Sequence, residues 1–342
     1  MKRSRSSTLP SLPTFSDLIG QTPLLDVSDI LPEKERARGI HIVAKAEFMN
    51  PGLSLKDRIV SHILGKAEEE GKLKKGGTVI CASSGNTGAA TAMLCAMRGY
   101  RCLVLTSPKC SDEKRRAIEA YGATLVIVAS DYDVKAAALA KEHGYFDIDQ
   151  YENTLNREAH YATLGAEIYE QTAGAVTHWV SGASTGGHIT GVSMYLKGKN
   201  EKIQTVLADP VGSVLLDSYR GSAIKAKADR GTSILEGVGK GRVPGNVDFA
   251  FVDKAVRIED QDAIAVCRRL AEEQGILAGG SSGLNVAAAL KVATDAPDGS
   301  VIACVLCDSG VKYLSKIYNN EFVNKAGLTT TRRFTIKVPK IE

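Results

Sequence analysis

The sequence predicts an α/β protein of two domains, with twisted, mostly parallel sheets that are covered by helices and with a site in the cleft between the domains. From Ile40 onward, short β-rich runs alternate with helical stretches, as in parallel sheets joined by right-handed crossovers. Loops rich in Gly, Ser and Thr stand between a strand and the next helix, where such sheets place their ligands. The length of 342 residues fits two modest domains.

The expected elements follow from apolar periodicity and from turn residues. Strands are expected at 41–48, 78–82, 101–106, 124–129, 145–149, 175–180, 203–208 and 301–306. Helices are expected at 56–71, up to 98, from 111 to 122, around 135–143, at about 156–171, up to 197, at 260–274 and after 279–283.

This order suggests how the chain is divided into domains. We expect a larger domain from 14–48 and 157–328 and a smaller, mobile domain from 49–156. Residues 1–13 are basic and rich in Ser and Pro, so we expect a disordered leader, with a short transit sequence as the alternative. Residues 329–342 are expected to form a C-terminal tail.

Composition excludes several classes of protein. The net charge of +4 shows no basic stripe, which argues against a nucleic-acid partner. No apolar run approaches the roughly 20 residues that span a bilayer, and the leader lacks the apolar segment of a signal peptide. Seven cysteines without framework spacing indicate a reducing compartment, and the cytoplasm is the default.

The first candidate functional residue is Lys56. Asn50-Pro51-Gly52 breaks any periodic pattern, and apolar residues then recur at helical spacing, with Ser54 as the expected N-cap. Lys56 therefore falls in the first turn of a helix, where a cation is mildly disfavoured. It is either a solvated surface residue, the commoner case, or an amine kept for chemistry. Only residues elsewhere in the chain that could act together with Lys56 can decide between these two interpretations.

Two loops could supply those partners. The loop from Gly182 to His188 brings backbone N–H groups and hydroxyls to a helix N-terminus, which suits a phosphate. It matches neither the Walker A loop nor the dinucleotide fingerprint, and such loops also occur simply as tight turns. A second loop, Ser83–Gly88, also precedes a helix.

Three other chemistries are weaker candidates. Gly279–Gly283 matches the G-x-S-x-G nucleophile elbow, but all six histidines precede Ser281, so the usual chain order of a triad is absent. Cys304 and Cys307 form a C-x-x-C in a buried-looking strand, where side chains three apart point to opposite faces. Neither cysteines nor histidines have metal-ligand spacing, so no metal is expected.

Five ordered motifs then resemble one family. They are Asn50-Pro51-Gly52-x-Ser54-x-Lys56-Asp57-Arg58, Ser84-Gly85-Asn86-Thr87-Gly88, Thr185-Gly186-Gly187, Glu236-Gly237-Val238-Gly239 and Gly280-Ser281-Ser282-Gly283. Their order and spacing resemble the cysteine synthase and cystathionine β-synthase family, from about Ile19 to Leu328. The resemblance implies a tryptophan synthase β-like fold (fold type II) and dependence on pyridoxal 5'-phosphate.

The resemblance also implies roles for particular residues. Lys56 would form the Schiff base with the cofactor and later take the Cα proton, which requires a lowered pKa. Asn86 would bond the ring hydroxyl, and Ser281 would face the pyridine nitrogen. The phosphate would be held by Gly182, Ser184, Thr185, Gly186, Gly187 and His188. The substrate would be bound by Ser83, Ser84, Asn86, Thr87 and Gln150, and Gly237 would line the substrate side, where a side chain would clash.

Some positions depart from the family pattern. Ser184 and His188 replace a glycine and a threonine of the usual phosphate loop, and Ser83 replaces a threonine. Glu236 and the Gly280–Gly283 motif are closer to cystathionine β-synthases, although no amino-terminal haem segment and no carboxy-terminal regulatory domain are recognised in the sequence.

The expected reaction is replacement of the β-substituent of an activated L-serine through an aminoacrylate, because a neutral Ser281 gives a weak electron sink. The first candidate is cysteine synthase, which makes L-cysteine from O-acetylserine and sulfide. Cystathionine formation from serine and homocysteine, and replacement on O-phosphoserine or by another nucleophile, remain alternatives. Two other classes stay open: a serine dehydratase or racemase, and a catalytically silent binding partner. The resemblance implies a homodimer.

Overall fold

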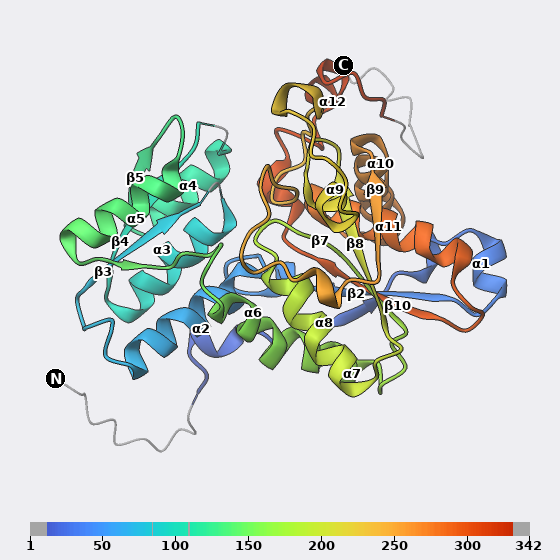
Figure 1. Cartoon of the computed structure of the whole chain (residues 1–342), viewed down its shortest axis with the longest axis horizontal. Coiled ribbons are helices and arrows are strands. Elements are labelled where there is room, and N and C mark those ends of the chain that lie inside the picture. Colours follow the sequence, from blue (N-terminus) through green and yellow to red (C-terminus); the bar gives the residue numbers. More distant parts are fainter. Residues whose placement is uncertain (1–11, 84, 109, 331–342) are drawn as a thin grey trace, which may run out of the picture.

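A computed structural model describes residues 12–83, 85–108 and 110–330. Figure 1 shows two lobes, one around β3, β4 and β5 and the other around β2, β7, β8 and β10. The described strands form a six-stranded sheet in the order β1-β2-β10-β7-β8-β9 and a four-stranded sheet in the order β5-β4-β3-β6. We name the lobes after these sheets. The expected α/β class with two sheets is confirmed.

The strands have the following bounds: β1 Leu24–Asp26, β2 His41–Ala46, β3 Thr78–Ala82, β4 Arg101–Thr106, β5 Thr124–Ile127, β6 Phe146–Asp147, β7 His178–Gly182, β8 Gln204–Pro210, β9 Lys254–Ile258 and β10 Val301–Leu306. The α-helices are α1 Glu33–Ala37, α2 Lys56–Glu69, α3 Asn86–Arg98, α4 Asp112–Ala120, α5 Tyr132–His143, α6 Leu155–His160, α7 Ala166–Gln171, α8 Gly187–Lys199, α9 Leu215–Tyr219, α10 Asp260–Gln274, α11 Gly280–Asp295 and α12 Asn320–Lys325. Short 3-10 helices lie at Phe15–Leu18, Ser28–Ile30, Glu47–Met49, Lys227–Asp229, Phe249–Phe251 and Gly310–Tyr313.

Strand β10 lies in the middle of the larger sheet. It runs parallel to β2, with Val305 opposite Lys45, and parallel to β7, with Ala303 opposite Trp179. A parallel strand between two neighbours is covered on both faces, which explains the unbroken apolar run of β10. Only β1 pairs in the antiparallel sense among the described strands.

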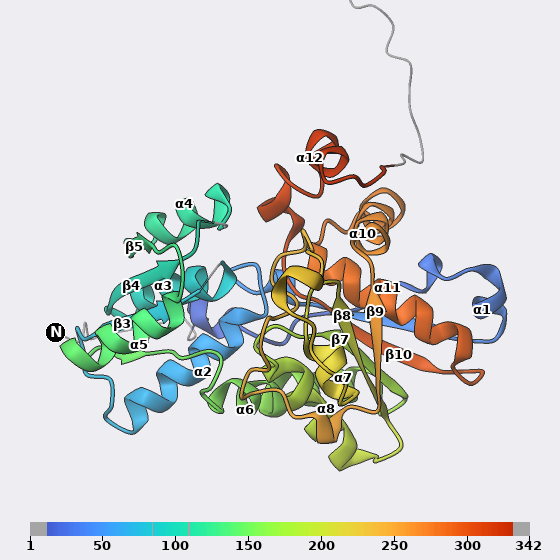
Figure 2. The same ribbon diagram turned by 45° about the horizontal axis from the view of Figure 1, so that its top comes forward.

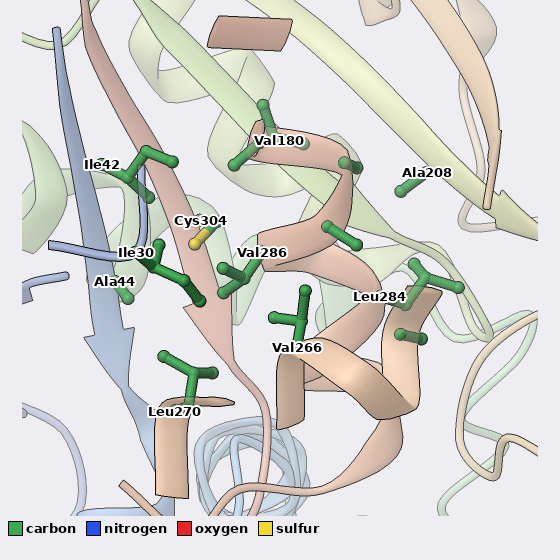
Figure 3. Packing of buried hydrophobic residues seen from close by; sticks show 14 of the residues in the cluster. Ile30, Ile42, Ala44, Val180, Ala208, Val266, Leu270, Leu284, Val286 and Cys304 are labelled. Carbon is green, nitrogen blue, oxygen red and sulfur yellow. The ribbon is translucent and has the colours of Figure 1, made fainter. Parts of the chain in front are cut away.

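The larger sheet has a separate apolar core on each face. Cys304 belongs to the core that includes residues of α10 and α11, such as Val266 and Leu284 (Figure 3). Ala303 and Val305 belong to the opposite core, with residues of α7 and α8. Helices therefore cover both faces, and Figure 2 shows α10 and α11 on the side of the sheet away from α8. The smaller sheet is also covered twice, by α2, α3 and α4 on one face and by α5 on the other.

Several predicted boundaries were wrong. The strand predicted at 41–48 ends at Ala46. A 3-10 helix follows it, and the side-chain Nδ2 of Asn50 donates to Glu47 O at 3.0 Å. The helix predicted at 156–171 is three pieces, α6, a π-helical turn at Tyr161–Gly165, and α7. The π turn lies against α8, where a Cβ at Gly165 would stand 2.8 Å from Tyr195 Cβ.

Other predicted strands shift or shorten. The strand predicted at 124–129 ends at Ile127, that predicted at 145–149 is reduced to Phe146–Asp147, that predicted at 175–180 becomes β7, and that predicted at 203–208 becomes β8. Strands β1 and β9 were missed. β1 has three residues and β9 is a partly charged edge strand, so neither has the apolar run that the sequence pattern requires.

The proposed domain boundaries stay a prediction. The four-stranded sheet uses residues between 78 and 147, inside the predicted smaller domain, and the six-stranded sheet uses residues on either side of it. Residues 1–11 and 331–342 hold most of the predicted leader and tail and lie outside the described residues. In the part of the chain that the structure describes, no helix is long and apolar enough to cross a membrane.

Candidate active site

Lys56 is the first residue of α2, as the sequence predicted, but Ser54 is not the N-cap. Leu55 holds that position in αR geometry, because its N–H is bonded to Cys307 O at 3.0 Å. Ser54 instead forms a bridge with Asp308, which follows β10. The start of the helix is thereby tied to the carboxyl end of the central strand, the edge where parallel sheets place ligands.

The Lys56 side chain lines a pocket between the two lobes. The pocket is lined by Leu55, Lys56, Ser83, Gly85, Asn86, Thr87, Lys114, Gln150, Tyr151, Ser184, His188, Glu236, Gly237, Ser281 and Cys307. Desolvation lowers the pKa of Lys56, although the nearby Cys307 and Asp308 oppose the shift. No described residue forms a hydrogen bond with the Lys56 amine. Such an amine is neutral at lower pH than an exposed lysine, which makes it a better nucleophile and base.

The predicted substrate residues meet at the start of α3. Thr87 Oγ1 donates to Gln150 Oε1 at 2.6 Å, and Gln150 Nε2 donates to Ala82 O at 2.7 Å. Ser83 Oγ accepts from Gly85 N at 3.1 Å. The helix behind them has 13 residues, so its N-terminus favours a carboxylate. Ser84, also predicted here, lies outside the described residues.

The predicted phosphate loop connects β7 to α8. Gly186 is the N-cap of α8, with φ at 89°, and no side chain caps the helix. A Cβ at Gly186 would lie 2.7 Å from Val247 N, so a larger residue would deform the loop. Thr185 Oγ1 accepts from Asn156 Nδ2 at 3.1 Å. Ser184 and His188 line the pocket, whereas Gly182, Thr185, Gly186 and Gly187 form the loop beside it.

His188 is a neutral side chain. Desolvation, assisted by the nearby Lys56, lowers its pKa to about 3. Its Nε2 lies 2.8 Å from Ser181 Oγ, and its buried Nδ1 has no partner among the described residues. Ser181 Oγ donates its one hydrogen to Gly182 O at 3.1 Å, so the single N–H of the neutral imidazole lies on Nε2 and donates to Ser181 Oγ, which leaves Nδ1 as an acceptor.

Asn86 and Ser281 line the pocket from two different helices, α3 and α11. Asn86 Nδ2 donates to Asp308 Oδ2 at 2.7 Å. Ser281 is the second residue of α11 and interacts with the Cys307 thiol, whose pKa burial raises to about 11. A neutral hydroxyl and a protonated thiol therefore form this wall.

These features fit pyridoxal 5'-phosphate. The Lys56 amine without an acceptor suits an aldehyde, and the uncapped N-terminus of α8 suits a phosphate. Lys56, Asn86 and Ser281, predicted from separate motifs, all line one pocket.

Gly237 lines the pocket, as predicted. A Cβ there would meet no protein atom within 4 Å, so the predicted clash with a bound substrate stays a prediction. Its φ of 78° is what favours glycine.

Sequence reasoning missed several pocket residues. Lys114, from α4, is 4 % exposed, and its Nζ contacts Glu236 Oε2 at 2.6 Å and Tyr313 OH at 3.2 Å across the two lobes. Glu236 also pairs with Lys316. Cys307 follows the carboxyl end of β10, and this position is the signal that could have identified it.

The two cysteines of the C-x-x-C differ in their surroundings, since Cys307 lines the pocket and Cys304 does not. Cys304 and Cys307 are buried in the cores on opposite faces of the sheet and are free thiols. Among the described residues, no group of three or more His, Cys, Asp or Glu side chains could hold a metal ion.

Comparison with known proteins agrees with this geometry. The family model described as "Pyridoxal-phosphate dependent enzyme" matches residues 15–308. Cysteine synthase A of Salmonella typhi is 40% identical over 309 residues, covering 87% of this chain and 92% of that protein. Cystathionine beta-synthase of Apis mellifera is 35% identical over 325 residues, covering 92% of this chain and 63% of that protein.

A solved structure of O-ureido-L-serine synthase superimposes with a TM-score of 0.82 and is 34% identical, covering 90% of this chain and 95% of that one. The family model's range, residues 15–308, extends over both lobes and includes the residues that line the pocket. The chain belongs to the family of pyridoxal-phosphate-dependent enzymes that includes cysteine synthases and cystathionine β-synthases.

Proposed function

We propose that this enzyme replaces the β-substituent of an activated L-serine, and that its reaction is the synthesis of L-cysteine from O-acetylserine and sulfide. The observation that carries the proposal is Lys56, an amine without a hydrogen-bond partner among the described residues, in a pocket that also holds Asn86 and Ser281. The names of the similar proteins support the reaction class, since cysteine synthases and an O-ureido-L-serine synthase are among them.

Each group would have a definite task. Lys56 would hold pyridoxal phosphate covalently and, once released, carry the proton taken from the substrate Cα. When bound, the cofactor supplies an electron sink that makes loss of that proton and of the β-substituent possible. The lowered pKa of Lys56 leaves more of its amine neutral near pH 7, as a base requires.

Substrate binding would depend on the start of α3. Ser83, Thr87 and Gln150 are each at most 5 % exposed, and their hydroxyl and amide groups would hold the carboxylate of the amino acid beside the helix N-terminus. This placement would fix the Cα–H bond relative to the Lys56 amine. Ser281, a neutral hydroxyl, would leave the ring nitrogen less protonated than a carboxylate would, which favours departure of a β-substituent over transamination.

The attachment site can be tested directly. Borohydride reduction of the cofactor-loaded enzyme, followed by peptide mapping, should place the tag on Lys56. Lys45 is a suitable internal control, because it is buried but ion-paired with Glu167 at 2.6 Å. A tag on Lys45, or no tag on loaded enzyme, contradicts the proposal.

The substrates can be identified with one panel. Purified enzyme receives serine, O-acetylserine or O-phosphoserine, each with sulfide, homocysteine or no nucleophile, and the products are identified by mass. Cysteine formed fastest from O-acetylserine and sulfide supports the proposal. Cystathionine from serine and homocysteine would favour the alternative, since Glu236 and the Gly280–Gly283 motif are closer to that group. Pyruvate or D-serine from serine alone would indicate a dehydratase or racemase, and a protein that never binds the cofactor would indicate a silent binding partner.

We further propose a cytoplasmic homodimer. All seven cysteines are free and buried, which suits a reducing compartment, and the dimer follows from the family resemblance. Light scattering coupled to size-exclusion chromatography should give twice the mass of 36.4 kDa, and a monomeric mass would contradict the second part.

A further inference from the structure

Lys312 is not among the residues that line the pocket, but it links the turn before Lys56 to Asn86. It belongs to the 3-10 helix Gly310–Tyr313, and its Nζ donates to Gly52 O at 2.9 Å, Leu53 O at 3.3 Å and Asn86 Oδ1 at 3.0 Å. The first two acceptors belong to the turn that precedes Lys56. An ammonium has three N–H groups and no acceptor, so these three oxygens match the charged form of Lys312.

These contacts determine which way the Asn86 amide faces. An amide can be turned by half a rotation with little change in shape, so its orientation must be inferred from its partners. Lys312 can only donate, which requires Oδ1 on its side. Asp308 Oδ2 accepts from Tyr313 OH at 2.6 Å and from Asn86 Nδ2 at 2.7 Å, and a carboxylate can only accept. The two partners therefore select the same orientation independently.

This orientation leaves one donor for a ligand. The Asn86 NH2 group has two hydrogens, of which Asp308 takes one, and Asn86 lines the pocket beside Lys56. The remaining N–H can serve an acceptor on the bound cofactor. With Oδ1 turned inward instead, Asn86 could only accept, and a ring hydroxyl facing it would have to keep its proton.

We propose that Lys312 is a positioning residue that, through the Asn86 amide, keeps an N–H directed at the ring hydroxyl of pyridoxal phosphate and so holds that hydroxyl ionised. The inference rests on the proposed function, since it assumes that Asn86 faces this hydroxyl. Hydrogen bonds from the protein tune the electronics of such a cofactor. Lys312 would also add a positive charge on the same side of the pocket.

The ionisation of the ring hydroxyl can be read from the absorption spectrum, because the ionised form absorbs at longer wavelength than the protonated form. Lys312→Met should lower the ratio of the long-wavelength to the short-wavelength band at least threefold at neutral pH. It should also weaken binding of pyridoxal phosphate to the apoenzyme about tenfold, the effect of one charge-assisted hydrogen bond. Lys312→Arg, which still donates, should restore most of the ratio.

Two comparisons separate positioning from general destabilisation. Asn86→Ala should give the same spectral change, and the double variant N86A/K312M should give no further change, because both substitutions remove one interaction. Lys197→Met is the matched control. Its Nζ donates to Ile203 O at 3.0 Å and pairs with Asp253, near the far end of α8, so its loss should leave the band ratio unchanged.

A loaded Lys312→Met enzyme with the parent band ratio would overturn the inference. Should that variant not fold, Lys312→Leu, which also cannot donate, faces the same two outcomes. Failure of the parent enzyme to bind pyridoxal phosphate would instead overturn the proposed function, so the two failures can be distinguished.

Discussion

Replacing Arg58 by methionine should be among the most damaging single changes in this protein. The guanidinium donates to Glu47 through Nε at 2.7 Å and Nη2 at 2.8 Å, and to Glu167 through Nη1 at 2.6 Å and Nη2 at 2.8 Å. These three side chains are between 0% and 6% exposed. Lys45 pairs with the same Glu167 at 2.6 Å, so two buried cations balance two buried carboxylates.

The size of the expected loss in stability depends on the charges that remain after the substitution. Without Arg58, Glu47 loses its only ion-pair partner in the described part of the chain, while Glu167 keeps Lys45. Removing one member of a buried pair typically costs about 3–5 kcal/mol. We therefore expect Arg58→Met to lower the free energy of unfolding by about 4 kcal/mol, which would also loosen the start of α2, two residues from Lys56.

The assay is urea unfolding followed by circular dichroism, with hydrogen exchange at α2 as a local measurement. The double variant R58M/E47Q should recover part of the loss, because it removes the unpaired charge. Asp298→Asn is the matched control, since the Asp298 side chain is 76% exposed in its pair with Arg38, and it should cost no more than about 1 kcal/mol. A loss below about 1 kcal/mol for Arg58→Met, with no recovery in the double variant, would refute the reasoning.

Three further predictions concern the site. Desolvation raises the pKa of Asp57 from 3.8 to about 7, so the folded protein binds this proton more tightly and stability falls as pH rises through that window. Asp57→Asn should flatten this pH dependence and be more stable above pH 7, by up to about 4 kcal/mol, and an unchanged pH profile of urea midpoints would contradict it. Gly186→Ala should destabilise the protein by about 2–4 kcal/mol and weaken cofactor binding. Gly99→Ala, with a similar φ but nothing within 4 Å of the added Cβ, should cost only about 1 kcal/mol. Equal thermal shifts for the two variants would show that the overlap of the added Cβ with Val247 does not matter. Gln150→Ala should raise the KM for the amino-acid substrate about tenfold and leave the KM for the nucleophile unchanged, because Gln150 holds Thr87 at the start of α3, and equal changes in both constants would argue against this role.

The sequence revealed the parts of the site that depend on local signals. Lys56 could be placed in the first turn of a helix from the Asn-Pro-Gly break and the spacing of apolar residues. The loops before α3 and α8 could be identified from glycine and hydroxyl residues between a strand and a helix. Such signals operate over a few neighbouring residues, and the structure keeps them.

Long-range partners could not be predicted in this way. Lys312 donates to Asn86 across 226 positions of the chain, and Lys114 reaches Glu236 across 122. Nothing in the local sequence marks either lysine, since Lys114 stands in a run of charged residues and Lys312 lies between Val311 and Tyr313. The π turn at Tyr161–Gly165 was not predicted for the same reason, because it lies against a helix that begins more than 20 residues later.

Glu236 forms one ion pair with Lys114 of the smaller lobe and one with Lys316 of its own lobe. Only the first of these would break if the lobes moved apart. Lys316 belongs to the same lobe as Glu236 and would move with it, so the Glu236 carboxylate would keep one ion-pair partner. Lys114 would lose its contact with Glu236 and its position 4.3 Å from the centre of the Tyr313 ring. Its ammonium group would then be hydrated by water. Separation of the lobes would therefore break one ion pair of Glu236, that with Lys114, and would leave the pair with Lys316 in place.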